Sequence, residues 1–157
     1  KLSASKLLAL HVGINEELRV RKITRSANNP TGDLAEYLFC KAFGWHQEPN
    51  SKHGYDAVDA DGKRYQIKGR RLHRRNKSRQ LSAIRNLEDG HFDVLAGVLF
   101  DETYGITHAA LIPRSVVEEQ SKFITHTNSN KFILRDEIWT MEGVEDVTQR
   151  LKIAFPK

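Results

Sequence analysis

The sequence contains a single cysteine, Cys40, among 157 residues, so the chain cannot close an internal disulfide. Without a second cysteine or a histidine pair at zinc-ligand spacing, the sequence argues against a structural zinc centre. No apolar run approaches the ~18 residues that cross a bilayer, and no signal-peptide pattern is present. We therefore expect a cytoplasmic protein without a membrane segment, in which Cys40 is a buried structural thiol.

Acidic residues are absent from one stretch of the chain. Residues 62–87 hold ten lysines and arginines and no acid, whereas the remainder holds fifteen basic and twenty acidic residues. The net charge of +5 therefore originates entirely in this stretch. A local run of one sign favours a phosphate-binding surface over an ordinary solvated face. The side chains expected to contact nucleic acid are Arg70, Arg71, His73, Arg74, Arg75, Lys77 and Arg79.

The length predicts one domain, residues 1–157, with a substantial core. The run from Phe92 to Phe100 is nearly continuously apolar, which is typical of a strand buried on both faces. Asn28-Asn29-Pro30 and Gly44 are start and stop signals for a helix whose apolar stripe includes Leu34 and Leu38. The remaining expected elements are helices over 3–24, 79–88 and 144–153, strands over 45–49, 105–112 and 132–139, and a helix capped by Ser115 and Glu118.

Residues 54–71 predict two short strands around the Asp61-Gly62 turn. A two-residue loop would mix polar and apolar side chains on each face of the hairpin. A three-residue loop over residues 60–62, with Gly62 left-handed, places Asp56 beside Gln66 and keeps each face uniform. We therefore expect an apolar face of Tyr55, Ala57, Tyr65 and Ile67 and a polar face of Asp56, Gln66 and Lys68.

The polar face has the donors that a hard cation binds. Mg²⁺ prefers oxygen ligands, keeps several waters, and binds through one or two carboxylates together with substrate phosphate. A carboxylate from Asp56 and an amide oxygen from Gln66 fit that preference, and Lys68 could orient a water or offset phosphate charge. The residues thus predict a Mg²⁺ site, with Mn²⁺ as a possible substitute.

The spacing D-x9-Q-x-K resembles the PD-(D/E)xK nuclease superfamily. The run GYDAVDADGKRYQIK is similar to the active-site hairpin of small type II restriction endonucleases, through G-x-D-A-V-D-x-x-G-x-x-Y-acid-aliphatic-K. Gln66 departs from that pattern, where a glutamate is usual, and looks like the Q-x-K variant of Mrr-type nucleases. The resemblance covers about fifteen residues closely and the order of the core elements loosely.

This resemblance implies an α/β fold with a restriction-endonuclease-like core, in which helices flank a mixed central sheet. It implies a Mg²⁺-dependent endonuclease acting on double-stranded DNA as a homodimer, with the N-terminal helical segment 1–28 as a candidate interface. The implied metal ligands are Asp56, Gln66, the backbone carbonyl of Ile67, and Glu36 as an auxiliary, while Lys68 positions the attacking water.

Several alternatives remain open from the sequence. Glu36 could instead be a surface carboxylate or a partner for Lys41 or an arginine. His53 and His73 are near the hairpin and the basic run, but both are compatible with ordinary surface histidines. For the whole chain, one alternative is a catalytically inactive DNA-binding protein with a nuclease fold. The other is an assembly module whose basic face meets an acidic protein or RNA.

Overall fold

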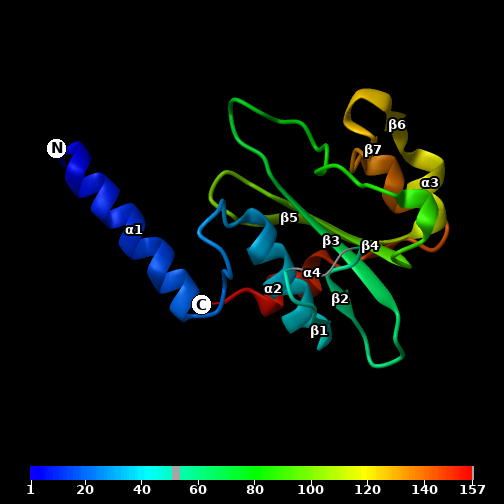
Figure 1. Cartoon of the computed structure of the whole chain (residues 1–157), viewed down its shortest axis with the longest axis horizontal. Coiled ribbons are helices and arrows are strands. Elements are labelled where there is room, and N and C mark those ends of the chain that lie inside the picture. Colours follow the sequence, from blue (N-terminus) through cyan, green and yellow to red (C-terminus); the bar gives the residue numbers. More distant parts are fainter. Residues whose placement is uncertain (51–53, 157) are drawn as a thin grey trace.

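The computed structural model describes residues 1–50 and 54–156 and has an α/β architecture around a mixed six-stranded sheet (Figure 1). In spatial order the strands are β1 (His46–Gln47), β2 (Ala57–Val58), β3 (Arg64–Arg71), β4 (Val94–Phe100), β5 (Ile106–Pro113) and β8 (Glu145–Asp146). Strands β3 and β4 are parallel and every other neighbouring pair is antiparallel. The expected α/β class and mixed sheet are therefore confirmed, and His53 lies outside the described residues.

Two hydrophobic clusters cover the two faces of the sheet. Helices α2 (Thr31–Phe43) and α4 (Thr148–Ala154) pack on one face, against Ile67, Ala96 and Val98. The other cluster joins Leu95 and Leu99 to α3 (Arg114–Gln120) and to the segments around Leu81 and Phe132. All residues of β4 are buried, which confirms the strand expected from its apolar run.

Helix α2 ends at the expected stop signal, but Pro30 rather than an asparagine occupies its N-cap position, with no side-chain cap. Asn29 Oδ1 accepts a hydrogen bond of 3.0 Å from the Thr31 N–H, and Gly44 ends the helix in the left-handed region at φ 69°. The helix lies very close to β3 at Gly69, where an added Cβ would be 3.0 Å from the Ala35 Cβ and from the Thr31 carbonyl oxygen. A glycine next to Lys68 thus allows α2, which carries Glu36, to approach the candidate site.

Cys40 also lies on α2, with its side chain packed against the first core cluster and only partly accessible. Burial, followed by the charge of Glu36, raises the pKa of its thiol to about 12. The thiol is therefore protonated and unreactive at neutral pH, which agrees with the structural role expected for it.

Two expectations for the C-terminal half are wrong. Residues 79–88 form no helix beyond the short 3-10 turn Leu87–Asp89, since Gln80 and Ile84 pair with Ile133 and Asn130. The expected strand 132–139 is replaced by β7 (Ser129–Lys131), paired with β6 (Lys122–Ile124), and by a 3-10 helix, Asp136–Thr140. The first difference comes from backbone pairing between segments about fifty residues apart, which no local apolar spacing encodes.

The capping box expected at Ser115 is also absent. Helix α3 begins at Arg114, so Ser115 lies inside it, and its first turn has no side-chain cap. The C-terminal helix is shorter than expected, because residues 145–146 form β8 and α4 begins at Thr148. Asp146 accepts a hydrogen bond from the Thr148 N–H at 2.9 Å. The side chain of Asp146 therefore stabilises the N-terminal end of α4.

Helix α1 (Ala4–Val20) is the expected N-terminal helix, slightly shortened, and it extends away from the sheet and its covering helices (Figure 1). Ser3 caps it by accepting from the Lys6 N–H, and Gly13 does not interrupt it. None of its residues is buried. Within residues 1–50 and 54–156, no helix has both the length and the apolar character that crossing a bilayer would require.

Candidate metal and nucleic-acid site

The hairpin that carries the candidate site has the predicted register. Ala57 pairs with Tyr65 and Val58 with Arg64, which leaves residues 60–62 as a three-residue loop. Gly62 has φ 82°, the left-handed conformation expected of it. Asp59 stabilises the turn by accepting hydrogen bonds from the Lys63 N–H and from the Tyr65 hydroxyl, at 2.9 and 2.8 Å. Asp59 therefore lies on the Tyr65 side and away from the polar face.

The apolar face of the hairpin is confirmed for Ala57, Tyr65 and Ile67, all buried in the cluster beneath α2. Tyr55 was expected on the same face but packs against the opposite cluster. The reason is an irregularity at Asp56, whose N–H bonds to the carbonyl of Tyr65, the residue that already pairs with Ala57. The alternation of faces therefore does not extend back to Tyr55.

Asp56 is the centre of the polar face. Its Oδ2 accepts hydrogen bonds from Gln66 Nε2 at 2.8 Å and from the Ile67 N–H at 2.6 Å. Burial raises the pKa of the Asp56 carboxyl above its ordinary value, and the Ile67 N–H and the charge of Lys68 oppose that rise. The carboxylate is thus desolvated but already held in position by two donors from β3.

Lys68 is the second charged group of the polar face. Burial lowers the pKa of its ammonium, while the charges of Asp56 and Glu36 act in the opposite direction. The charge of Arg85, near the end of the basic stretch, reinforces the lowering of this pKa. The structure records no hydrogen bond or ion pair between Lys68 and another described residue, so its ammonium can bind a water or a phosphate oxygen.

Glu36 reaches this group from α2. Its Oε2 accepts hydrogen bonds from the guanidinium of Arg25, as an ion pair, and from Gln47 Nε2 at 2.8 Å. Burial and the nearby charge of Asp56 raise the pKa of Glu36. The sequence alternative of an arginine partner is thus present, and the structure also brings Glu36 near Asp56. Arg25 and Gln47 carry no local sequence motif that predicts their contact with Glu36, because they lie in a loop and a two-residue strand.

The donor set fits Mg²⁺ better than a cation that requires a closed protein cage. Among the residues that the structure describes, no cluster of three or more histidine, cysteine, aspartate or glutamate side chains could hold a metal. Mg²⁺ requires fewer, because it keeps several waters and binds through one or two carboxylates plus substrate phosphate. No described residue donates a hydrogen bond to Asp56 Oδ1 or to Glu36 Oε1, which leaves one carboxylate oxygen on each residue for a cation.

The basic residues after Lys68 divide into two groups. Arg70 donates to the Ser78 carbonyl at 3.1 Å, Arg71 donates to the Glu102 carbonyl at 2.9 Å, and Arg79 pairs with Asp136. These three side chains are held by neighbouring segments. The second group, on the long loop that follows β3 (Figure 1), is exposed and consists of Arg74, Arg75 and Lys77.

A tight turn presents the exposed group. His73 and Asn76 exchange backbone hydrogen bonds of 3.1 and 2.9 Å, so Arg74 and Arg75 occupy the two central positions of the turn. The Arg74 side chain is 92% exposed, with only a 3.8 Å approach to Glu102. His73 Nδ1 accepts a hydrogen bond of 3.3 Å from the Arg75 N–H, so the imidazole helps to stabilise the turn.

Comparison with known proteins found no family model that matches the chain and no curated protein that matches it.

Proposed function

We propose that this protein is a Mg²⁺-dependent endonuclease that hydrolyses phosphodiester bonds of double-stranded DNA, with a restriction-endonuclease-like core. The observation that carries the proposal is the position of Lys68. Its unpaired ammonium lies close to the partly buried carboxylate of Asp56 and to Glu36, on a strand within the basic stretch. A structural lysine in such a place would be expected to form an ion pair, whereas a catalytic one needs a free donor.

The residues that would hold Mg²⁺ are Asp56 and Glu36, through the oxygens that accept no hydrogen bond from described residues. Gln66 Nε2 is occupied by Asp56, so Gln66 would contribute its carbonyl oxygen, and the Ile67 carbonyl is the remaining proposed ligand. When bound, the cation would polarise a phosphodiester and lower the pKa of a coordinated water.

The protein's own groups prepare this site before any substrate is bound. Gln66 and the Ile67 N–H fix the Asp56 carboxylate, so its orientation does not have to be set during the reaction. Arg25 holds Glu36 and compensates its charge. Lys68 would then donate a hydrogen bond to the attacking water, or to the phosphate oxygen on which negative charge develops.

The exposed turn would supply contacts to the DNA backbone. The exposed side chains of Arg74, Arg75 and Lys77 are free to reach phosphates. Arg70 and Arg71 lie on β3 with Lys68, between Lys68 and the exposed turn in the sequence. One such site cuts one strand, so a double-strand break requires two copies, and we propose a homodimer in the cytoplasm.

A catalytically inactive DNA-binding protein is the second candidate, and two features of the site favour it. Gln66 is neutral where a carboxylate would bind the cation more tightly, and the Arg25–Glu36 ion pair places a fixed positive charge beside an auxiliary ligand. Both contacts would weaken Mg²⁺ binding without affecting the basic turn.

Incubation of methylated and unmethylated supercoiled plasmid with the protein, in Mg²⁺ or in EDTA, separates the two candidates. The nuclease proposal predicts nicked and linear products in Mg²⁺ alone. Retarded plasmid that stays supercoiled in Mg²⁺ and in Mn²⁺ would instead support the inactive DNA-binding protein. The assembly-module alternative predicts neither cleavage nor salt-sensitive retardation.

A further inference from the structure

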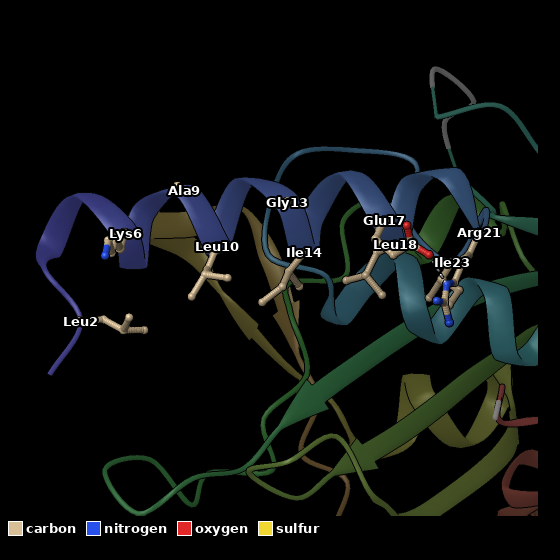
Figure 2. A pocket seen from close by; sticks show the side chains of 10 residues that line it. All are labelled: Leu2, Lys6, Ala9, Leu10, Gly13, Ile14, Glu17, Leu18, Arg21 and Ile23. Carbon is tan, nitrogen blue, oxygen red and sulfur yellow. Dashed lines mark hydrogen bonds and ion pairs between the residues drawn. The ribbon is translucent and has the colours of Figure 1, made fainter.

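Two hollows on the surface of the molecule differ in chemistry. The hollow along α1 is lined mainly by apolar side chains, and Figure 2 shows Leu10, Ile14 and Leu18 directed to the same side of the helix. A smaller hollow of about 280 Å³, the β3 pocket, lies where the start of α2, the end of β3 and the turn 73–76 meet. Apart from Gly69, the residues that line the β3 pocket are polar. The β3 pocket is therefore suited to a ligand that forms hydrogen bonds.

The β3 pocket adjoins the candidate active site. Gly69 and Arg71 line it, and both lie on β3 directly after Lys68. A strand rises ~3.3 Å per residue, so the pocket lies within roughly 10 Å of Lys68 along β3. Successive phosphates of one DNA strand are ~3.4 Å apart along the helix axis, so a duplex cleaved at Lys68 would bring bases within about three steps of the cut to the pocket.

Backbone groups hold the polar side chains of the β3 pocket in fixed orientations. The Ser78 carbonyl accepts a hydrogen bond of 3.1 Å from Arg70 Nε, and the Ser78 N–H donates one of 3.0 Å to Asn76 Oδ1. On the α2 side, Asn29 Oδ1 accepts from the Thr31 N–H at 3.0 Å. Fixed groups of this kind are needed to distinguish one base from another, whereas contacts to phosphate mainly set position.

The same hydrogen bonds determine which atoms of the two asparagines remain for a ligand. Asn29 and Asn76 each use the side-chain oxygen within the protein, so each has its Nδ2 amine free, and an amine is a donor. The Thr31 hydroxyl is already engaged, because it donates to Asn29 Oδ1 at 2.6 Å and lies 3.2 Å from the Tyr104 hydroxyl. The asparagines therefore offer the β3 pocket donors and no acceptor.

Arg70 and His73 add further donors. Arg70 uses only Nε for Ser78, so no described residue accepts a hydrogen bond from its two terminal nitrogens. His73 Nδ1 accepts from the Arg75 N–H, which leaves the proton of the neutral imidazole on Nε2. The free side-chain groups of the β3 pocket are thus all donors, and the matching ligand is a group that presents acceptors.

Guanine is the base whose exposed edge consists of acceptors. In the major groove it presents N7 and O6, whereas adenine and cytosine present a donor amine, and thymine presents one acceptor beside a methyl group. Arginine bonded to N7 and O6 is the commonest specific contact between protein and DNA. We propose that the β3 pocket recognises a guanine edge close to the cleaved bond, with Arg70 as the main donor and Asn76 beside it. This inference rests on the proposed DNA binding, which the active and the inactive candidate share.

DNA binding in EDTA, where no cleavage is expected, identifies the base that the pocket recognises. Duplexes with randomised positions, retained by wild type and then sequenced, should show guanine enriched on the order of tenfold at one fixed position of the site. Replacing that guanine by 7-deazaguanine removes N7 but leaves base pairing and phosphates intact, and it should weaken binding several-fold. A pool without guanine enrichment, or equal affinity for the two duplexes, would overturn the proposal and leave phosphate contacts only.

Asn76→Asp tests the donors of the protein, because it exchanges one donor for an acceptor. One carboxylate oxygen can keep the hydrogen bond from the Ser78 N–H, while the other replaces the free amine. The preferred base at that position should change from guanine to cytosine, whose amine donates to a carboxylate. Asn28→Asp is the matched control, since Asn28 is exposed and does not line the pocket. It should weaken binding of all sequences alike, and an equal, uniform loss in both variants would contradict the proposal.

The outcomes separate this inference from the proposed nuclease activity. Guanine enrichment by a protein that never cleaves DNA would support the pocket and overturn the nuclease. Mg²⁺-dependent cleavage by a protein that binds all sequences equally would overturn the pocket alone. A wild type that retains no duplex of the pool would overturn both.

Discussion

The side-chain N–H of Gln66 donates a hydrogen bond of 2.8 Å to Asp56 Oδ2. The neutral residue of the Q-x-K sequence therefore contacts the Asp56 carboxylate directly. The amide of Gln66 can donate this hydrogen bond when no cation is bound, whereas a glutamate at position 66 would place two carboxylates side by side. The hydrogen bond therefore stabilises the Asp56 carboxylate in its partly buried site when no metal is bound. A glutamate at position 66 would remove this hydrogen bond and add a second negative charge beside Asp56.

Gln66→Glu should lower the Mg²⁺ concentration for half-maximal cleavage, because a carboxylate binds a hard cation more strongly than an amide oxygen. Without metal, the variant should be less stable than wild type, since the new charge lies against Asp56. A Mg²⁺ titration followed by both plasmid cleavage and thermal melting measures the two effects.

Gln66→Ala is the control for that titration, because it removes the hydrogen bond without adding a charge. If the Glu and Ala variants respond identically to Mg²⁺, Gln66 does not contact the cation. If wild type is inactive and Gln66→Glu cleaves DNA, the natural chain is the inactive DNA-binding protein.

Asp56→Asn should stabilise the fold at pH 8 while removing cleavage. The pKa of Asp56 is raised by burial, so the folded state takes up the proton at higher pH than the unfolded chain. The ionised carboxylate therefore costs stability above the raised pKa, and this cost disappears as the pH falls through it. Urea unfolding at several pH values should show the advantage of the variant shrinking toward acid pH.

Asp59→Asn, in the same hairpin, should change the stability at pH 8 in the opposite direction. Although burial acts to raise the pKa of Asp59, hydrogen bonds from the Lys63 N–H and the Tyr65 hydroxyl lower it overall. Its ionised form stabilises the fold above the unfolded pKa, so this variant should be less stable than wild type at pH 8. A destabilised Asp56→Asn at pH 8 would contradict a net cost of burying the Asp56 charge.

Lys68→Met should reduce the cleavage rate by a factor of about 10² to 10³, the loss typical when one donor to the developing charge is removed. The apolar replacement keeps the volume of the buried stem, and the lost ammonium has no ion-pair partner among described residues. Mg²⁺ binding measured by calorimetry should persist. A variant that cuts at the wild-type rate would remove Lys68 from the proposed chemistry.

Arg74→Ala together with Arg75→Ala should weaken DNA binding and flatten its salt dependence by up to ~2 in the slope of log K against log salt, about 0.9 per lost phosphate contact. Both arginines lie at the tip of an exposed turn, so the fold should be unaffected. Lys41→Ala with Lys122→Ala removes the same charge from exposed positions elsewhere and should leave the slope unchanged. An unchanged slope in the arginine variant would rule out the turn as the DNA contact.

The sequence predicted those parts of the molecule that depend on local rules. The Asp61-Gly62 turn, the alternation along the hairpin and the apolar run of β4 were sufficient for the register of the site and the centre of the sheet. The path of residues 79–88 could not be predicted this way, because its backbone pairs with Asn130 and Ile133 far along the chain.

The surroundings of Glu36 were equally inaccessible to sequence reasoning. Its contacts with Arg25 and Gln47 join a loop, a helix and a short strand, and only the packed fold brings them together. The proximity of Glu36 to Asp56 likewise depends on the close approach of α2 to β3 at Gly69.

Cleavage of supercoiled plasmid by wild type and by Asp56→Ala, purified in parallel, tests the central proposal most directly. We predict that wild type nicks and linearises the plasmid in Mg²⁺ and not in EDTA. The Asp56→Ala variant should bind the DNA at least as tightly, because a negative charge facing phosphate is gone, yet release no product. Equal Mg²⁺-dependent cleavage by both proteins, or none by wild type on any DNA with Mg²⁺ or Mn²⁺, would contradict the proposed active site.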